Sequence, residues 1–154
     1  MPNRQSLVWG METAEGIGLR KISEELSYSD FTTSSTVYGI ANMSQTIPAG
    51  SFVVGSKVTV LEAFSGGDNT TMVMDVGTSA DDDLFSYTTH DISSVASNLV
   101  EGADSSAGGT TGTGLVPISS ATTVQLKITV NSSYDTISAG QLIVDVYYLS
   151  TNPE

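Results

Sequence analysis

The sequence contains one histidine, and with it one conceivable nucleophilic site. His90 precedes Asp91 in the stretch YTTHDIS, and serines are numerous elsewhere. A serine hydrolase needs a histidine base, an acid that orients it and an activated serine, often in a G-x-S-x-G turn. That turn is absent from the sequence, and residues adjacent in sequence rarely reach the geometry of a base and its orienting acid. We therefore predict that His90 is a solvent-exposed loop residue and that the chain has no catalytic residues.

Two isolated carboxylates lie among apolar residues, Glu62 in VLEAF and Asp145 in IVDVY. An apolar setting raises the pKa of an acid and can produce a general acid. Both residues follow the alternation of a strand closely enough that we predict solvent-facing or edge positions for them. A pair of carboxylates that only the fold brings together, as in glycosidases, stays an open alternative at this point.

Aspartates gather in the stretch DVGTSADDDLF. Asp81, Asp82 and Asp83, together with Asp75, offer the oxygen ligands that Ca²⁺ prefers. The spacing of an EF-hand loop is absent, and three consecutive residues of an extended chain point alternately to opposite sides. We predict that this run starts the next strand through Asx turns and binds no metal. The stretch GGTTGTG lacks the Lys-Ser/Thr of a phosphate-binding loop, so no cofactor is expected.

Strands are the elements that must position these side chains. Apolar and polar residues alternate along four stretches, residues 56–64, 71–76, 123–130 and 141–149. Shorter apolar runs mark further candidate strands at residues 37–43, 84–87, 95–100 and 115–118. Clusters of Gly, Ser, Asn and Asp between these runs suit turns. The pattern predicts an all-β protein, an antiparallel β-sandwich of jelly-roll-like type.

One phrase occurs twice in the sequence: TIPAGSFVV at residues 46–54 returns as TISAGQLIV at residues 136–144. In each copy an Ala-Gly pair ends a turn and an apolar run enters a long strand. Gly50 and Gly140 permit backbone angles that other residues resist, and Pro48 suits a strand edge. Because nothing else in the two halves aligns, we interpret the phrase as repeated turn architecture and not as a functional site.

The first part of the chain differs from the rest and is predicted to be an arm. We expect an N-terminal extended arm (residues 1–34), a sandwich domain (35–149) and a short C-terminal tail (150–154). The arm holds the only tryptophan, Trp9, and the spacing of Leu19, Ile22 and Leu26 allows one helical turn. Its apolar residues must either fold back on their own domain or dock on a neighbour, because a terminal segment is poorly ordered unless it is tied down.

Charge and composition exclude several classes of partner. The chain has 17 acidic and 5 basic residues, and residues 35–154 hold only two lysines against twelve acids. Nucleic acids and anionic membranes attract proteins through cations, so neither is an expected partner. The absence of cysteine excludes disulfides and thiolate chemistry. No apolar run has the length of a membrane span, and the first ten residues lack the apolar core of a signal peptide.

Four stretches of the sequence resemble a known type of protein: TIPAGSFVVGSKVTVLEAF, MDVGTSADDDLFS, SATTVQLKITV and SAGQLIVDVYYL. Over roughly residues 36–149 they are similar to small β-sandwich virion proteins of tailed bacteriophages, which include capsid decoration (cement) and head-fibre proteins. The resemblance implies a non-enzymatic structural protein that binds the exterior of a phage head and stabilises it. It also implies the major capsid protein as partner, a homotrimer, and assembly in the host cytoplasm.

Under this interpretation the arm supplies the contact residues. The candidates for contact with the capsid or with another subunit are Leu7, Val8, Trp9, Ile17 and Leu19. An alternative use of the same fold is a glycan- or receptor-binding module of a fibre or tail. In that case Phe85, Tyr87 or Tyr134 would stack on sugars. A hydrolytic enzyme would need a polar constellation that the sequence does not show.

Overall fold

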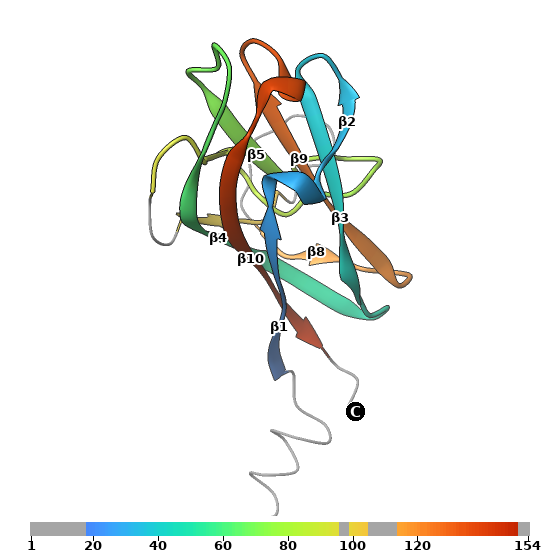
Figure 1. Ribbon diagram of the computed structural model, residues 1–154. Helices are drawn as coiled ribbons and strands as arrows, with labels where there is room; N and C mark the ends of the chain where they lie inside the picture. The colour runs from blue at the N-terminus through green and yellow to red at the C-terminus, as the bar shows by residue number, and fades with distance from the viewer. Residues whose placement is uncertain (1–17, 96–98, 105–113, 151–154) are drawn as a thin grey trace, which may run out of the picture.

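The computed structural model describes residues 18–95, 99–104 and 114–150, which form a sandwich of two antiparallel sheets (Figure 1). Sheet A contains, in order, β1 (Gly18–Ser27), β10 (Ala139–Ser150), β4 (Ser51–Ser65) and β7 (Leu99–Gly102), and β8 (Val116–Pro117) also pairs with β4. Sheet B contains β2 (Thr32–Ser35), β3 (Tyr38–Ile47), β9 (Thr122–Val130), β5 (Met72–Gly77) and β6 (His90–Asp91). The predicted all-β sandwich is confirmed.

The order of the strands is that of a jelly roll. Without the short strands β2 and β8, sheet A has the order β1-β10-β4-β7 and sheet B the order β3-β9-β5-β6. When these eight strands of the described residues are renumbered from one to eight along the chain, the orders become 1-8-3-6 and 2-7-4-5. Two single 3₁₀ turns, η1 (Tyr28–Asp30) and η2 (Tyr134–Thr136), are the helical elements of these residues. No helix in the described part of the chain is long and apolar enough to cross a membrane.

The core lies between the two sheets and is built from the alternating residues of the long strands. In β9 the buried residues are Val124, Leu126, Ile128 and Val130, and in β10 they are Leu142, Val144, Val146 and Tyr148. These are the faces that the alternation predicts. Two aromatic rings close one region of the core, where Phe31 and Phe64 meet edge to face with their centroids 6.2 Å apart. Such edge-to-face pairs are the favoured aromatic geometry.

The repeated phrase marks the starts of the two longest strands, as predicted. β3 ends at Ile47, a turn follows in which Gly50 has φ 81°, and β4 begins at Ser51. The second copy leads into β10, where Gly140 has φ 139° and lies against the ring of Phe64. The two strands that follow the phrase pair with each other in the middle of sheet A. The phrase therefore has the architectural role that we expected for it.

The predicted boundary of the arm is corrected by β1. Residues 18–27 pair with β10 over ten consecutive registers, and Ile22 and Leu26 are buried in the core. Residues 18–34 therefore belong to the sandwich, and no helix forms around Leu19, Ile22 and Leu26. Residues 18–27 are extended and not helical because, as a strand, they pair with the backbone groups of β10. The other expected arm residues, 1–17, and the tail residues 151–154 lie outside the described residues.

Candidate interaction surface

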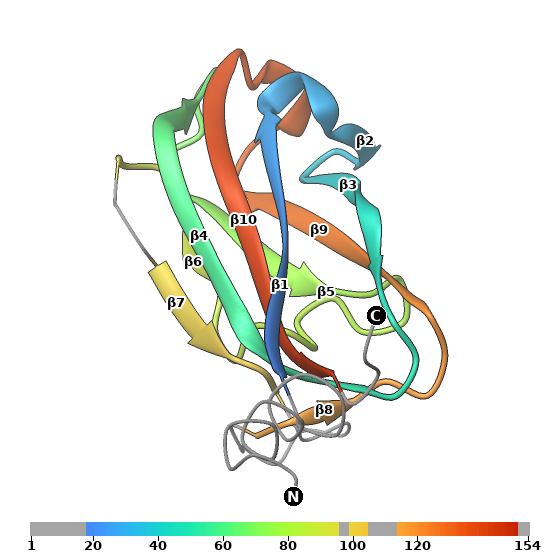
Figure 2. The same ribbon diagram turned by 90° about the horizontal axis from the view of Figure 1, so that it is seen from below.

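The outer face of sheet A, the face turned away from sheet B, carries a row of apolar side chains. Leu19 of β1 stands opposite Leu149 of β10, Leu149 opposite Phe52 of β4, and Phe52 opposite Pro117 of β8. Residues opposite each other in an antiparallel sheet project on the same face. The row therefore crosses four strands at the end of the sheet where β1 begins and β10 ends (Figure 2).

Large exposed apolar residues concentrate around this row. We call the apolar patch the five residues Leu19, Phe52, Val54, Val100 and Leu115, which are 64%, 37%, 37%, 65% and 49% exposed. They come from β1, from β4, from β7 and from the residue before β8. Of the large exposed apolar residues in the described part of the chain, only three lie elsewhere: Tyr28, Leu61 and Val95. Contiguous apolar patches on soluble proteins, once larger than a few hundred Å², usually mark an interaction site.

A hollow of about 200 Å³ lies within the apolar patch. Its walls include Leu19, Val54, Val100 and Tyr147, and Gly55 and Gly102 stand opposite each other on its floor. The register between β4 and β10 shifts at this point, so that Val54 is the extra residue of a β-bulge. A Cβ atom on Gly55 would lie 2.3 Å from the carbonyl oxygen of Glu101. The close approach of β4 and β7 thus requires glycine, and the missing side chains leave the hollow.

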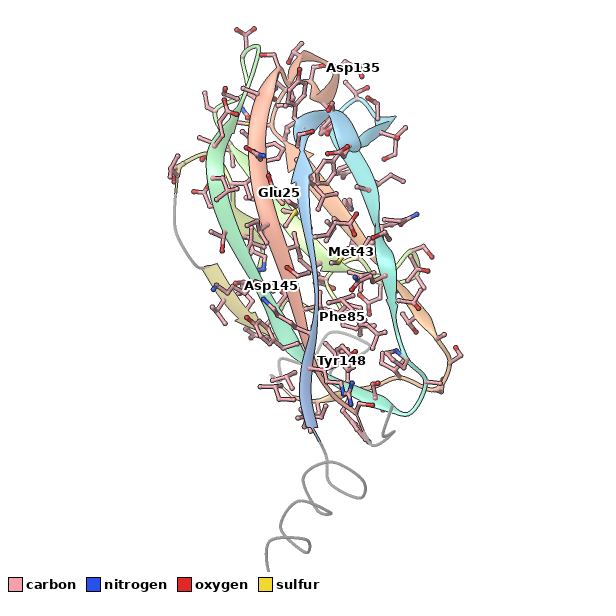
Figure 3. All side chains as sticks on the ribbon, turned by 60° about the horizontal axis from the view of Figure 1, so that its bottom comes forward. Glu25, Met43, Phe85, Asp135, Asp145 and Tyr148 are labelled. Atoms are coloured by element: carbon pink, nitrogen blue, oxygen red, sulfur yellow. The ribbon has the colours of Figure 1, made fainter. Side chains whose placement is uncertain are left out.

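Charged side chains border the hollow on the far side from the apolar row. Asp145 lies on β10 (Figure 3) and faces outward. The Nζ of Lys21 on β1 donates a hydrogen bond to its Oδ1 at 3.0 Å, and Lys57 of β4 stands opposite it. The bond to Asp145 raises the pKa of Lys21. Asp145 lies on the outer face of sheet A but is only 5% exposed, so the prediction that its side chain is solvent-facing or at an edge is wrong. Glu62 is exposed, as predicted.

Of the five predicted contact residues, the structure places one in this surface. Leu19 lies in the apolar patch, while Leu7, Val8, Trp9 and Ile17 fall outside the described residues. The other four members of the patch do not stand out in the sequence. Val100 and Leu115 lie in short apolar runs typical of strands, and nothing in the sequence shows that they face outward. A two-residue period identifies two faces of a strand but not which of them meets the core.

His90 is a core residue and not an exposed loop residue, so that prediction is wrong. It lies in β6 and is 1% exposed, and its Nε2 is 3.3 Å from the Oγ of the equally buried Ser56. Burial lowers the pKa of His90 to about 4, against a smaller opposing effect of Glu101. Its Nδ1 has no hydrogen-bond partner among the described residues, and Asp91 instead accepts hydrogen bonds from Ser93. A serine–histidine contact sealed inside the core, without an orienting acid, gives no access to a substrate.

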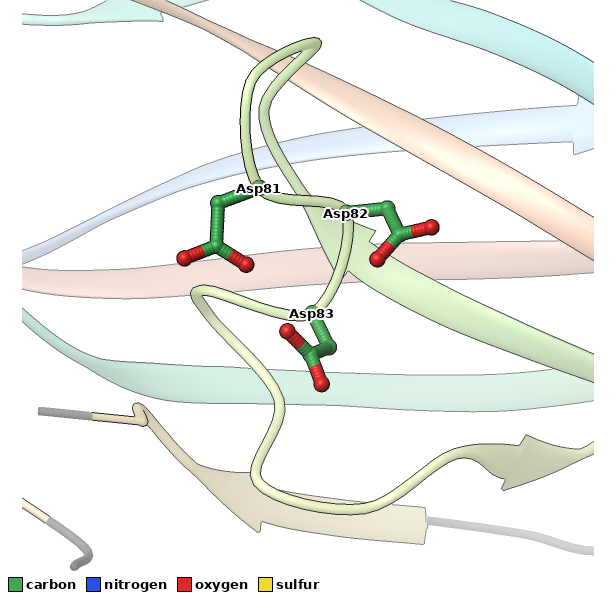
Figure 4. Close-up of side chains that lie close together, drawn as sticks. All are labelled: Asp81, Asp82 and Asp83. Carbon is green, nitrogen blue, oxygen red and sulfur yellow. The ribbon is translucent and has the colours of Figure 1, made fainter. Parts of the chain in front are cut away.

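The aspartate run forms a compact turn over the outer face of sheet B. Carboxylate oxygens of Asp81, Asp82 and Asp83 lie within 4.8 Å of one another (Figure 4), because the run forms a turn and not an extended chain. The ammonium group of Lys127 forms an ion pair with Asp82 and lies 4.3 Å from the centre of the Tyr38 ring. This cation already neutralises part of the cluster. No observation in the described residues points to a bound ion.

A fourth carboxylate, Asp75, lies close to this turn. It is 9% exposed, and burial raises its pKa from 3.8 to about 6, with Asp82 and Asp83 acting in the same direction. The pKa of Asp83 is also raised, first by burial and then by its hydrogen bond to Asp81. The shifts follow from burial and from the crowding of like charges, and the ion pair with Lys127 offsets part of that charge.

The aromatic side chains considered for sugar stacking are mostly inside the protein. Phe85 is fully buried and Tyr134 is 4% exposed, with its ring in the space that a side chain on Gly39 would need. Tyr87 is partly buried. Stacking on a sugar needs an exposed ring face, so two of the three expected platforms are unavailable for it.

Comparison with known proteins finds a likeness of fold but no match of sequence. No protein-family model and no curated protein matches the sequence. The fold is similar to that of a chain in the solved capsid asymmetric unit of cyanophage Pam1. The two chains are 17% identical, the match covers 88% of this chain and 86% of that chain, and the TM-score is 0.55. At this identity the likeness shows that the two chains share a fold.

Proposed function

We propose that this protein is a non-enzymatic structural component of a tailed-phage virion that binds the exterior of the capsid as a decoration (cement) protein. The observation that carries the proposal is the apolar patch on sheet A, because it offers a contact surface on a fold that also occurs in a phage capsid. The partner is the major capsid protein. The stabilising effect comes from apolar area that is removed from water when the patch meets the capsid.

The charge of the protein supports a position on the outside of the head. With a net charge of −12 the chain repels packaged DNA, which is itself a dense array of negative charge. Within this acidic molecule, Lys21 and Lys57 lie beside the apolar patch on the same face of sheet A. Together with Asp145, which lies between them, they give the contact surface a polar rim beside an apolar centre, the usual arrangement of a protein interface.

The absence of a reactive constellation among the described residues agrees with a binding role. His90 and Ser56 are sealed in the core, and the aspartates of the turn are engaged with Lys127 and with one another. We propose a homotrimer as the unit that binds, because decoration proteins of this type occupy threefold positions. Sedimentation of the purified protein over a range of concentrations measures this state.

A binding experiment tests the proposed function. Purified protein is mixed with phage capsids that lack it, and cosedimentation and thermal stability of the capsids are measured. We expect saturable binding and stabilised capsids, and we expect Leu115→Glu to weaken binding at least tenfold, because it places a carboxylate in an apolar contact. Leu61→Glu is the matched control, since Leu61 is 44% exposed near the other end of β4.

Deletion of residues 1–17 tests the part of the arm that precedes β1. The cut stops at residue 17 because a longer deletion would remove the pairing of β1 with β10 and unfold the edge of sheet A. We expect the shortened protein to stay folded and to bind capsids weakly. Equal binding by Leu115→Glu, by the shortened protein and by the unchanged protein would overturn the proposed function.

A further inference from the structure

The hollow in the apolar patch has the size and chemistry of a socket for one side chain. Its volume of about 200 Å³ is smaller than the ~300–1,000 Å³ that pockets for small-molecule ligands occupy. Its walls include the aliphatic Leu19, Val54 and Val100 and the ring of Tyr147, and Ser56 and Glu101 also contribute to the lining. A flat aromatic ring fits such a site, because it can pack its faces against aliphatic groups and its edge against another ring.

We propose that the side chain of Trp9 of the same chain occupies this hollow in the free protein. Large apolar side chains are confined to one of the segments outside the described residues. Residues 96–98 are Ala-Ser-Asn, and residues 105–113 and 151–154 have the one-letter sequences SSAGGTTGT and TNPE. Residues 1–17 contain all of the large apolar residues of these segments, and among them Trp9 has the largest side chain and is followed by Gly10.

The length of the connection allows this placement. Eight residues lie between Trp9 and Gly18, where β1 begins, and the nine steps from one Cα to the next reach up to about 30 Å when extended. The hollow lies between β1 and β7, three strand spacings apart, or about 14 Å. The connection is therefore about twice as long as the distance across the sheet. The spare length permits the chain reversal that brings residue 9 back over the outer face, and Gly10 and Gly16 ease that reversal.

Occupation by the same chain is favoured over occupation by a second copy. A segment tethered within reach of its site has an effective concentration in the millimolar range, far above that of free copies in dilute solution. The hollow is also next to the tether, since Leu19 is both the second residue of β1 and a wall of the hollow. Trp9 in the hollow completes the apolar patch as one continuous surface, in which Tyr147 and Gly55 are covered.

Tryptophan fluorescence tests the proposal directly, because Trp9 is the only tryptophan in the chain. We expect blue-shifted emission and weak quenching by acrylamide for the full chain. Val100→Glu places a carboxylate at the hollow and should lower the docking equilibrium constant roughly tenfold, with a red shift and stronger quenching. Val95→Glu is the matched control, because Val95 is 68% exposed and is not part of the hollow. Circular dichroism confirms that each variant is folded.

A cross-link distinguishes the same chain from a second copy. The protein has no cysteine, so Val8→Cys and Val100→Cys introduce one defined pair. We expect oxidation to give a disulfide within one chain at a yield that does not depend on protein concentration. If Val100→Glu fails to fold, Leu19→Glu replaces it, since Leu19 is 64% exposed.

Three results would overturn the proposal: emission like that of the unfolded chain, a protected tryptophan that neither variant releases, or a disulfide that forms between chains. These measurements use the free protein without capsids. A failure here therefore leaves the capsid-binding proposal standing, and failure of capsid binding leaves the docking of Trp9 standing.

Discussion

Replacing Asp75 with asparagine should stabilise the protein at neutral and alkaline pH. Asp75 is 9% exposed on β5, close to the carboxylates of Asp82 and Asp83. In the unfolded chain its carboxylate is surrounded by water. In the folded protein the same charge loses hydration and meets like charges, which is why its pKa is about 6 and not 3.8. Asparagine keeps the shape of the side chain and removes the charge.

The pKa of Asp75 gives the size and the pH range of this effect. Between pH 3.8 and about 6 the folded state binds more protons than the unfolded state, so the free energy of unfolding falls as the pH rises through this range. The difference between the two pKa values corresponds to about 3 kcal/mol once the pH is above both. Asp75→Asn should therefore gain about 2–3 kcal/mol at pH 8 and gain almost nothing at pH 3.5, where aspartic acid is neutral in both states.

Urea unfolding at pH 8 and pH 3.5 measures both quantities. The matched control is Asp68→Asn, which removes an exposed aspartate from the turn between β4 and β5 and should have little effect. The explanation fails if Asp75→Asn is no more stable than the unchanged protein at pH 8. It also fails if the gain is the same at both pH values, because a gain from packing or hydrogen bonding would not follow the titration of a carboxylate.

Three further results are expected. Because burial lowers the pKa of His90 from 6.5 to about 4, the unfolded state takes up a proton first, and the contribution of His90 to the free energy of unfolding should decrease by about 3 kcal/mol as the pH falls through this range. Asp75 contributes in the opposite direction over part of this range, so the contribution of His90 is measured as the difference between the unchanged protein and His90→Asn, and a difference that stays constant with pH would contradict the prediction. Gly140→Ala should cost several kcal/mol in chemical denaturation, since its Cβ would lie 2.4 Å from the Phe64 ring, whereas Gly18→Ala, with no atom within 4 Å, should change little. Calcium should leave the Tm unchanged, and an increase that is lost in Asp82→Asn would show that the Asp81–Asp83 cluster binds it.

The strands that could be predicted from the sequence are those whose own residues alternate between apolar and polar. β9 and β10 alternate strictly, so both the strand and its buried face follow from the residues. β1 lacks this property, because only Ile22 and Leu26 of its apolar residues face the core, while Leu19 faces outward. Spacings of three and four residues suggested a helical turn. The partner strand, which the local sequence does not contain, decides the outcome.

The candidate surface depends on relations between strands and was for this reason hidden in the sequence. The row from Leu19 to Pro117 exists only because four strands align in one register. The hollow exists because a bulge at Val54 places Gly55 opposite Gly102. His90 and Phe85 are buried for the same reason. Their segments have weak strand patterns, but they fill the space between two sheets whose longer strands alternate clearly.

The pairing of Gly18 with Ser150 has a practical consequence for anyone who attaches a reporter to this protein. Both residues lie at the same end of sheet A, next to Ser51, so a tag fused before β1 or after β10 emerges beside the apolar patch. β4 spans 15 residues from there, about 50 Å, to the turn that holds the exposed Asp68. A cysteine at position 68 would be unique in the chain, so a dye placed there can follow attachment to a capsid without entering the contact.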